Sequence, residues 1–304
     1  MIAPEGLPEV VRIRDVGPRD GLQPEAPLSV GDRVALVDRL TDAGVAYIEV
    51  TAFVSPKAVP AMAGAAEVLA RVRRSPGVSY GALVPNVRGA TDALGAGVDE
   101  LTVTISASET YNQRNVHMSV EESRSVVGEI AVLAQAGGVG VDAVVSCAFG
   151  SPYEGDLDPL DLAAVVDGLL ESGCARCTLA DTTGMATPHR IVAAIDQVGV
   201  DVGLHLHQTR GTALLNAFVA LERGVTRFDT SIGGLGGSPF ADGAGGNLAT
   251  EELVALLDDC GVRTGIDLDS LLGASALVET LIGRPVPSGV AHAGPRSRRA
   301  PREA

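Results

Sequence analysis

Runs of apolar residues alternate with segments of helical periodicity through most of the chain. Eight of these runs have the length and the content of small and branched aliphatic residues that buried strands require. They lie at Val10–Val16, Val45–Thr51, Val78–Val84, Glu100–Ile105, Val141–Cys147, Arg176–Ala180, Val202–His207 and Thr226–Ile232. Strands that are apolar along nearly their whole length are buried on both faces, so the pattern indicates a parallel sheet covered by helices.

Segments with apolar residues three and four positions apart separate the predicted strands. The clearest are Val30–Ala43, Ser119–Ala136, Pro159–Ser172, Pro188–Val198 and Thr212–Arg223. Two of them open with Pro, which the first turn of a helix tolerates. Glycines that fit helix C-caps occur at Gly44, Gly97, Gly137, Gly173 and Gly224. Eight strands alternating with helices favour a closed barrel over an open sheet.

The chain continues beyond the eighth predicted strand. A glycine-rich segment over residues 233–247 precedes helical patterns that begin at Leu248 and cover Leu268–Ile282. The predicted fold is therefore α/β, a (β/α)8 TIM barrel with additional C-terminal helices, formed by residues 1–284. Residues 285–304 are rich in Pro and Arg, and we expect a disordered tail there. An anion-binding role for its arginines is the alternative.

Composition narrows the classes of function. The 304 residues include 23 basic and 38 acidic side chains, a net charge of −15. This balance argues against nucleic-acid binding, which needs a basic surface, but it permits an anionic small substrate held by a few arginines. The first residues lack the basic and apolar regions of a signal peptide, and no apolar stretch approaches the ~20 residues of a membrane span. We expect a cytoplasmic protein with no membrane or nucleic-acid partner.

The four cysteines are too few for a disulfide framework. Cys174 and Cys177 form a C-x-x-C pair, but no second pair or His completes a zinc site. They fall at the start of the sixth predicted strand, away from the end of the barrel where active sites form. We interpret them as buried core thiols.

Polar and ionisable residues gather where five of the predicted strands end. They are Arg19, Asp20 and Gln23 after the first strand, Glu49 in the second, Asp181 after the sixth, His205 and His207 in the seventh, and the segment from Gly233 to Asn247 after the eighth. The C-terminal ends of barrel strands meet at one face, which is where barrel enzymes place their active sites. The sequence therefore predicts one polar site at this face.

A divalent metal is the ligand that these side chains favour. His205 and His207 are two residues apart, so on a strand both point to one face. Asp20 is the candidate carboxylate ligand, and the amide oxygen of Asn247 is a candidate fourth. Nitrogen and oxygen ligands without a thiolate suit Mg²⁺ or Mn²⁺. A structural, hydrogen-bonded histidine is the alternative for either ring.

Arg19 has two possible roles. Its guanidinium could donate to a carbonyl or enolate oxygen and stabilise the negative charge that develops there. It could instead form a structural ion pair with Glu49 or Asp181. Both roles are compatible, because an ion pair would also orient the guanidinium.

The sequence resembles the 3-hydroxy-3-methylglutaryl-CoA lyases, within the wider family of metal-dependent barrel lyases and aldolases. The matching segments occur in the family's order over roughly residues 10–284. They are VGPRDGLQ (16–23), YIEVTAFVSPKAVPAM (47–62), SCAFGSPYEG (146–155), LADTTG (179–184), HLHQTRGTALLNA (205–217) and GGLGGSPFADGAGGNLATEEL (233–253).

The resemblance implies a function and a role for each site residue. The reaction would be a retro-Claisen cleavage of an acyl-CoA to acetyl-CoA and acetoacetate, in a homodimer. Deprotonation of the substrate's 3-hydroxyl would break the C2–C3 bond. The implied metal ligands are Asp20, His205, His207 and Asn247. The implied catalytic residues are Arg19, His205, Glu49, Asp181 and Ser238, and the implied substrate-binding residues are Gln23, Asn115, Gly236 and Gly237.

Three departures from the family pattern concern the edge of the predicted pocket. Ser238 stands where the family has a loop Cys that handles the product carbanion, and a hydroxyl ionises far less readily than a thiol. Gln208 and Arg210 replace an Asp and a frequent Tyr, and Ala52 replaces a common Ser. A related 3-hydroxy acid or 3-hydroxyacyl-CoA substrate, a condensing reaction and a non-catalytic binding role are therefore alternatives.

Overall fold

Eight parallel strands form a closed barrel in chain order, with β1 paired to β8. The structure is a computed structural model that describes residues 6–237 and 245–296. The strands are β1 (Arg12–Asp15), β2 (Tyr47–Ala52), β3 (Ser79–Leu83), β4 (Glu100–Ser106), β5 (Gly140–Ser146), β6 (Arg176–Ala180), β7 (Gly203–His205) and β8 (Arg227–Thr230). The predicted (β/α)8 barrel is confirmed, and each strand falls within or beside its predicted range.

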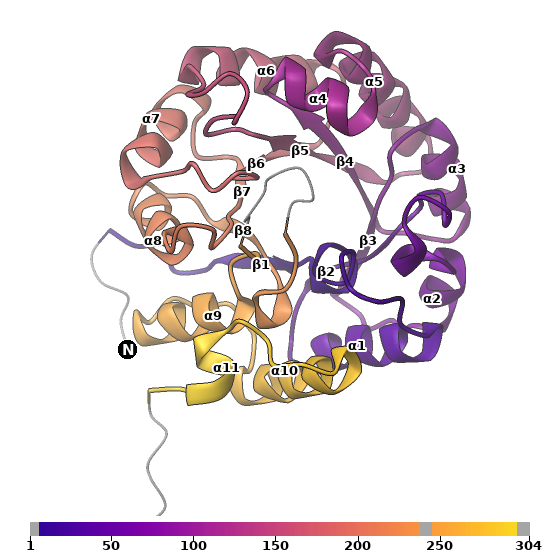
Figure 1. Ribbon diagram of the computed structural model, residues 1–304, viewed down its shortest axis with the longest axis vertical. Coiled ribbons are helices and arrows are strands. Elements are labelled where there is room, and N and C mark those ends of the chain that lie inside the picture. The colour runs from indigo at the N-terminus through magenta and orange to yellow at the C-terminus, as the bar shows by residue number, and fades with distance from the viewer. Residues whose placement is uncertain (1–5, 238–244, 297–304) are drawn as a thin grey trace, which may run out of the picture.

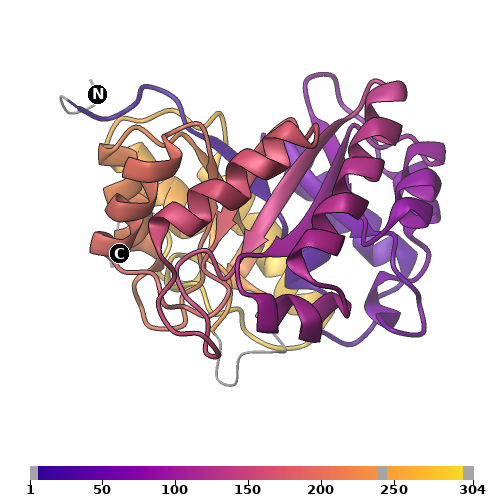
Figure 2. The ribbon, with the colours of Figure 1, turned by 90° about the horizontal axis from the view of Figure 1, so that it is seen from above.

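Helices surround the barrel as an outer ring (Figures 1 and 2). They are α1 (Val30–Asp42), α2 (Ala65–Arg71), α3 (Val87–Gly95), α4 (Glu109–Val116), α5 (Val120–Ala136), α6 (Pro159–Glu171), α7 (Pro188–Val198), α8 (Ala213–Glu222), α9 (Thr250–Asp259), α10 (Leu268–Ile282) and α11 (Gly289–Ala293). Three short helical turns are η1 (Gly17–Gly21), η2 (Pro60–Met62) and η3 (Ile232–Gly234). The first and last long helices, α1 and α10, lie side by side (Figure 1).

Helix starts follow the local sequence. The Ser29 side chain accepts a hydrogen bond from the amide of Asp32 at the start of α1. Ser119 and Glu122 form a reciprocal capping box at the start of α5. Pro159 and Pro188 occupy the first positions of α6 and α7, as predicted. These caps fix where the helices begin and therefore how long the preceding loops are.

The pattern analysis missed α2, α3 and α4. Each has at most nine residues, and α4 is mostly polar along its length. Helices this short are marginal on their own and are stabilised by tertiary contacts. In α4, those contacts bury Tyr111 and Asn112. Strands β7 and β8 are shorter than predicted, because apolar residues continue beyond the ladder hydrogen bonds.

Local order continues past residue 284. Val286 and Ser288 are buried, and the Ser288 hydroxyl caps α11 by accepting from the amide of Ala291. The described residues 285–296 contact α9, α10 and η3, and the composition of this segment did not indicate these contacts. Residues 297–304 lie outside the described part.

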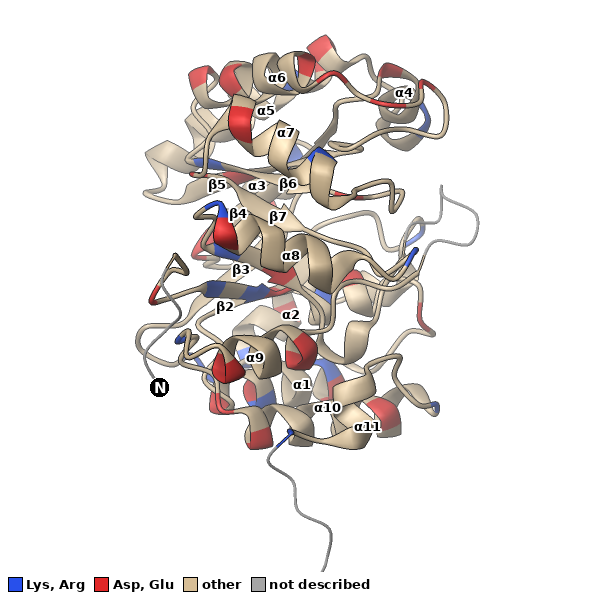
Figure 3. Ribbon diagram, turned by 90° about the vertical axis from the view of Figure 1, so that its left-hand side faces the viewer, with Lys and Arg blue, Asp and Glu red and all other residues tan. Residues whose placement is uncertain are grey.

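The cysteines, the surface charge and the helix lengths bear on further predictions from the sequence. Cys174 and Cys177 are buried free thiols, and burial raises the pKa of each to about 12, as expected for inert core residues. Acidic residues are spread over the outer helices (Figure 3). In the described ranges, every helix is too short or too polar to cross a bilayer.

Glu251 is a buried carboxylate that ties three elements together. It lies in α9, accepts hydrogen bonds from the amide of Gly233 in η3 at 3.0 Å, and accepts another from the hydroxyl of Ser275 in α10 at 2.6 Å. Burial raises its pKa to about 7, against the opposing effect of these hydrogen bonds. The carboxylate therefore takes up a proton in the folded state at a higher pH than in the unfolded chain.

This shift predicts how stability depends on pH. Between the unfolded pKa of about 4.5 and the folded value of about 7, only the folded state keeps the proton. The contribution of Glu251 to stability is thus fully present below the lower value and is lost as the pH rises through the upper one. Relative to Glu251→Gln, the wild type should gain on the order of 3 kcal/mol in unfolding free energy between pH 8 and pH 5. Urea unfolding of both proteins measures this, and a difference that does not change with pH contradicts it.

Candidate active site

The turn after β1 presents Arg19 and Asp20 at the C-terminal end of the barrel. This turn, η1, is a single π-helical turn in which the amides of Asp20 and Gly21 both donate to the carbonyl of Val16. Asp15, at the end of β1, holds the turn from below: its carboxylate accepts from the amide of Gly17 at 2.8 Å and from the Thr250 hydroxyl at 2.6 Å. π-Helical turns occur frequently at functional sites.

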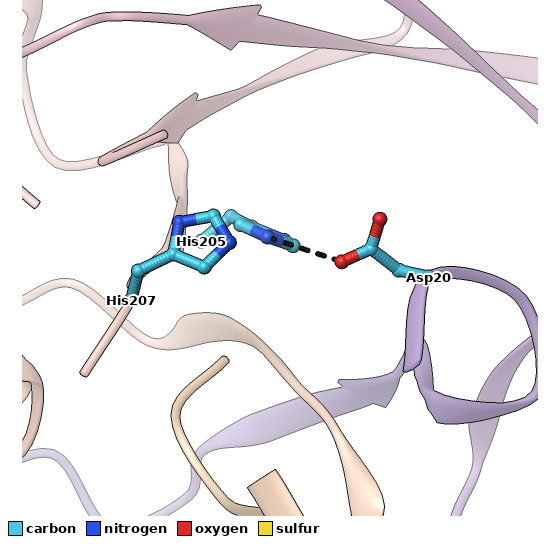
Figure 4. A group of neighbouring side chains, drawn as sticks. All are labelled: Asp20, His205 and His207. Atoms are coloured by element: carbon cyan, nitrogen blue, oxygen red, sulfur yellow. Dashed lines mark ion pairs between the residues drawn. The ribbon is translucent and has the colours of Figure 1, made fainter. Parts of the chain in front are cut away.

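Asp20, His205 and His207 converge on one point. Figure 4 shows both imidazole rings and the carboxylate facing one another from β7 and η1. The His205 Nε2 atom is 3.9 Å from Asp20 Oδ2, and the two ring centroids are 5.0 Å apart. One ligand atom from each of the three residues can be chosen so that all lie within 4.8 Å of one another. The side-by-side placement predicted for the two histidines is confirmed, although β7 itself ends at His205.

Asn247 completes the group. Residues 246–248 pair alongside the chain that continues from β7, with Gln208 donating to Gly246 and Leu248 donating to Leu206, both at 2.8 Å. The Asn247 amide nitrogen donates to Asp20 Oδ2 at 2.7 Å and to the carbonyl of Leu235 at 2.9 Å. Its Oδ1 is buried with no hydrogen-bond partner among the described residues. An unpartnered buried oxygen beside a carboxylate and two imidazoles is what an unfilled ligand position would leave.

Glycine is required where these segments meet. A Cβ atom on Gly236, whose φ is +107°, would lie 2.4 Å from the Asn247 amide nitrogen. A Cβ atom on Gly246 would lie 1.9 Å from the carbonyl oxygen of Gly234. Both contacts are far below van der Waals distance, so these glycines allow the approach that brings Asn247 to Asp20.

The charges in the group favour cation binding. Burial opposes ionisation of Asp20, but Arg19, His205 and Asn247 together lower its pKa, so it stays a carboxylate. Burial and the neighbouring His205 lower the pKa of His207 to about 4, which keeps this ring neutral. Its Nδ1 lies 2.9 Å from the carbonyl oxygen of Asp181, to which only an N–H can donate. The Nε2 lone pair of His207 is therefore free to act as a ligand.

Arg19 is held by two carboxylates beside the same point. Its Nε donates to Glu49 at 2.5 Å and its Nη1 donates to Asp20 at 2.6 Å. The Gln23 side-chain oxygen lies 3.5 Å from Nη1. Of the two pairings proposed from the sequence, the one with Glu49 is observed, and Asp181 instead accepts from the amide of Ala186. These contacts fix the guanidinium plane at the edge of the group.

Asp181 is a second buried carboxylate close to the site. Burial raises its pKa to about 7, and its Oδ2 has no hydrogen-bond partner in the described chain. Because its own carbonyl holds His207, any change in the loop after β6 would be felt directly by that ring.

A cavity of about 300 Å³ opens in front of the group. Its polar lining includes Arg19, Asp20, Gln23, His205 and His207, and Asn115 of α4 and Gly237 also line it. Apolar side chains in the lining include Val54, Val59, Leu83, Val116 and Val144. The residues predicted to line the pocket thus lie at it, apart from Gly236, which contacts Asn247 instead.

The residues that depart from the family pattern lie in different parts of the structure. Arg210 is not in the cavity lining; its Nη1 donates to the carbonyls of Thr183 at 2.9 Å and Gly184 at 2.7 Å, which fixes the loop after β6. Gln208 accepts from the amide of Ala213 at the start of α8. Ala52 is buried in β2. Ser238 lies outside the described residues.

Sequence analysis missed Arg14 and Asp229. Both lie in the middle of predicted strands, and they are paired directly across the β1–β8 seam. The signal was present in the sequence, because both residues are charged and lie inside predicted buried strands, where charged side chains are rare unless they are paired.

Comparison with known proteins agrees with this geometry. The family model described as HMGL-like matches residues 10–278. The chain belongs to the HMGL-like family. It is 43% identical to the 3-hydroxy-3-isohexenylglutaryl-CoA/hydroxymethylglutaryl-CoA lyase of Pseudomonas aeruginosa, over 91% of this chain and 95% of the relative. It is 40% identical to a hydroxymethylglutaryl-CoA lyase of Bacillus subtilis, over 92% and 96%.

A solved structure extends the comparison to the whole fold. An HMG-CoA lyase of Acinetobacter baumannii in complex with coenzyme A and 3-methylmalate superposes with a TM-score of 0.91 at 36% identity, covering 99% of both chains. The predicted family and the assignment as a carbon–carbon lyase are therefore confirmed.

Gly246→Ala should displace Asn247 from this site. The new methyl group cannot coexist with the Gly234 carbonyl, so the segment must shift, which should cost about 1–3 kcal/mol in unfolding free energy. Affinity for Mn²⁺ should fall by about 10–100-fold, as when a metal site loses its support. Urea unfolding and calorimetric titration measure the two effects.

Gly273→Ala is the matched control. This glycine is exposed within α10 and has open space around its Cβ position. Its replacement by Ala should stabilise the helix by about 0.5–1 kcal/mol and leave the affinity for Mn²⁺ unchanged. Equal Mn²⁺ affinity in all three proteins would mean that the approach at Gly246 does not place a ligand.

Proposed function

We propose that the protein cleaves 3-hydroxy-3-methylglutaryl-CoA to acetyl-CoA and acetoacetate in a reaction that depends on a divalent cation. The convergence of Asp20, His205, His207 and the unpartnered Asn247 oxygen, with Arg19 beside them, carries this proposal. The names of the relatives support the substrate. They also favour cleavage over the alternatives that Ser238 raises, which are a different substrate, a condensing reaction and a non-catalytic role.

The donor set fits Mg²⁺ or Mn²⁺. One carboxylate, two neutral-capable imidazoles and one amide oxygen offer nitrogen and oxygen without sulfur. Asp20, His205, His207 and Asn247 would hold the ion, and Asp181 would support it through His207. When bound, the cation would lower the pKa of the substrate's 3-hydroxyl.

Arg19 would bind and stabilise the oxygen on which charge develops. Its contacts with Glu49 and Asp20 use Nε and Nη1, so Nη2 is the donor left to face a thioester or enolate oxygen. Glu49 would act by holding this orientation. Gln23 and Asn115, which line the cavity, and Gly237 would contact the substrate.

His205 would move the proton of the 3-hydroxyl. Its Nε2 faces Asp20 and the cavity, and its Nδ1 faces Asp229. Nε2 has one lone pair, so ligation and proton acceptance are alternatives for any one step. Loss of the hydroxyl proton lets the oxygen form a ketone as C2–C3 breaks. The pair of electrons moves to the acetyl-CoA enolate, which is then protonated at C2. We assign Ser238 to this second proton transfer, in the place of the family's Cys.

We propose a homodimer in the cytoplasm, by resemblance to the family. The acidic net charge of −15 is consistent with the absence of a nucleic-acid partner.

An assay of acetoacetate release from 3-hydroxy-3-methylglutaryl-CoA with Mg²⁺ or Mn²⁺ tests the function. The wild type should turn over, and Asp20→Asn should lose at least about 10²-fold in kcat, because one ligand and one partner of Arg19 are removed together. Chelation of the metal should abolish turnover, and its return should restore it.

Ser238→Cys, measured in parallel, addresses the loop residue. Turnover by the wild type within about tenfold of Ser238→Cys would show that the hydroxyl suffices. Activity in Ser238→Cys alone would restrict the proposal to the variant and overturn it for the natural chain. If neither protein released acetoacetate, 3-hydroxy-3-methylglutaryl-CoA would be ruled out as the substrate.

A further inference from the structure

A connected set of charged side chains lies inside the barrel and reaches His205. The set consists of Asp229 in β8, Arg14 in β1, Glu100 in β4, Asp142 in β5 and Arg176 in β6. The three carboxylates are buried, Arg14 is largely buried, and Arg176 is partly exposed. Aliphatic layers usually fill the interior of a (β/α)8 barrel. Charges are expensive to bury, so three buried carboxylates in one interior call for a reason beyond filling space.

Asp229 bridges the candidate metal centre and this charged layer. Its Oδ2 lies 3.2 Å from His205 Nδ1. The same carboxylate accepts two hydrogen bonds from Arg14, from Nε at 2.8 Å and from Nη2 at 2.7 Å. This two-point contact fixes the plane of the carboxylate as well as its position. Arg14 in turn is the neighbour of Asp229 in the β1–β8 ladder, so the pair is set by barrel closure.

Arg14 is itself held from the far side. Its Nη1 contacts Glu100 at 3.1 Å and Asp142 at 2.9 Å, and Glu100 also pairs with Arg176. Three carboxylates around one guanidinium leave it little freedom to rotate. Asp229 is therefore oriented by Arg14 of β1, which Glu100 of β4 and Asp142 of β5 hold in turn.

We propose that Asp229, oriented by Arg14, is a positioning residue that fixes the tautomer and the ring orientation of His205. A carboxylate opposite Nδ1 requires the proton on that nitrogen, which leaves the Nε2 lone pair directed toward Asp20. Partners of this kind on the second nitrogen of a ligating imidazole raise its basicity and hold its plane. This inference rests on the proposed metal site.

The two histidines are held by different means. The Nδ1 atom of His207 faces a backbone carbonyl, which no side-chain substitution removes, whereas that of His205 faces a side chain. Asp229 is thus the point at which the ligand geometry can be altered without touching a ligand.

Asp229→Asn tests the proposal because an amide can donate to Nδ1 and stabilise the opposite tautomer. Mn²⁺ affinity, measured by electron paramagnetic resonance of the free ion, should fall by about 10–100-fold. Arg14→Lys, which keeps the charge but loses the two-point contact, should give a smaller loss. Circular dichroism checks that each variant is folded.

Asp142→Asn is the matched control. It removes a buried carboxylate from the same arginine at a similar distance but has no contact with His205. Its Mn²⁺ affinity should fall no further than that of Arg14→Lys, because Asp229 keeps both of its hydrogen bonds to Arg14. An equal loss in Asp142→Asn and Asp229→Asn would mean that the charged layer acts on the site only through its overall field or through stability, and would overturn the proposal.

Nitrogen NMR of the metal-free wild type gives a readout independent of folding in the variants and of catalysis. At a pH high enough that the ring is neutral, His205 should carry its proton on Nδ1. A proton on Nε2 would overturn the positioning role. Failure of the wild type to bind Mn²⁺ would overturn the proposed metal-dependent function, while the NMR result would still decide how Asp229 holds the ring.

Discussion

Pairing of β1 with β8 closes the barrel, and the candidate site depends on that closure. Residues 20 and 247 are 227 positions apart in the chain, yet the Asn247 side chain donates to Asp20. The same seam brings Arg14 opposite Asp229. An open sheet of the same strands would separate η1 from the segment after β8 and would take Arg14 and Asp229 out of each other's reach. Closure thus satisfies the buried charges and assembles the site in one step.

The site combines ionisable groups, each of which would cost free energy to bury alone. Asp20 stays ionised because Arg19 and Asn247 offset its burial, while His207 stays neutral because burial and His205 oppose a second positive charge. A carboxylate facing neutral-capable nitrogen atoms is an arrangement that a cation stabilises. One side-chain oxygen each of Asn247 and Asp181 is buried without a hydrogen-bond partner among the described residues.

Much of this architecture could be predicted from the sequence, because it depends on the periodicity of apolar residues and on the positions of polar residues at the strand ends. Near-continuous apolar runs indicated eight strands, and the two-residue spacing of His205 and His207 placed both rings on one face. Two sorts of feature could not be predicted. Helix α4, which supplies Asn115, is too short and polar to have a pattern and is formed by its contacts. The link from His205 through Asp229 to Arg14 depends on strand register, which periodicity alone does not set.

A crystal structure with bound Mn²⁺, in which anomalous scattering locates the ion, is the most direct test of the central claim. We expect one ion between Asp20, His205 and His207. An imidazole nitrogen of each histidine and the side-chain oxygen of Asn247 should bind it. An ion that binds elsewhere in the barrel, or that leaves either imidazole unligated, would contradict the claim that this face of the barrel is a metal centre.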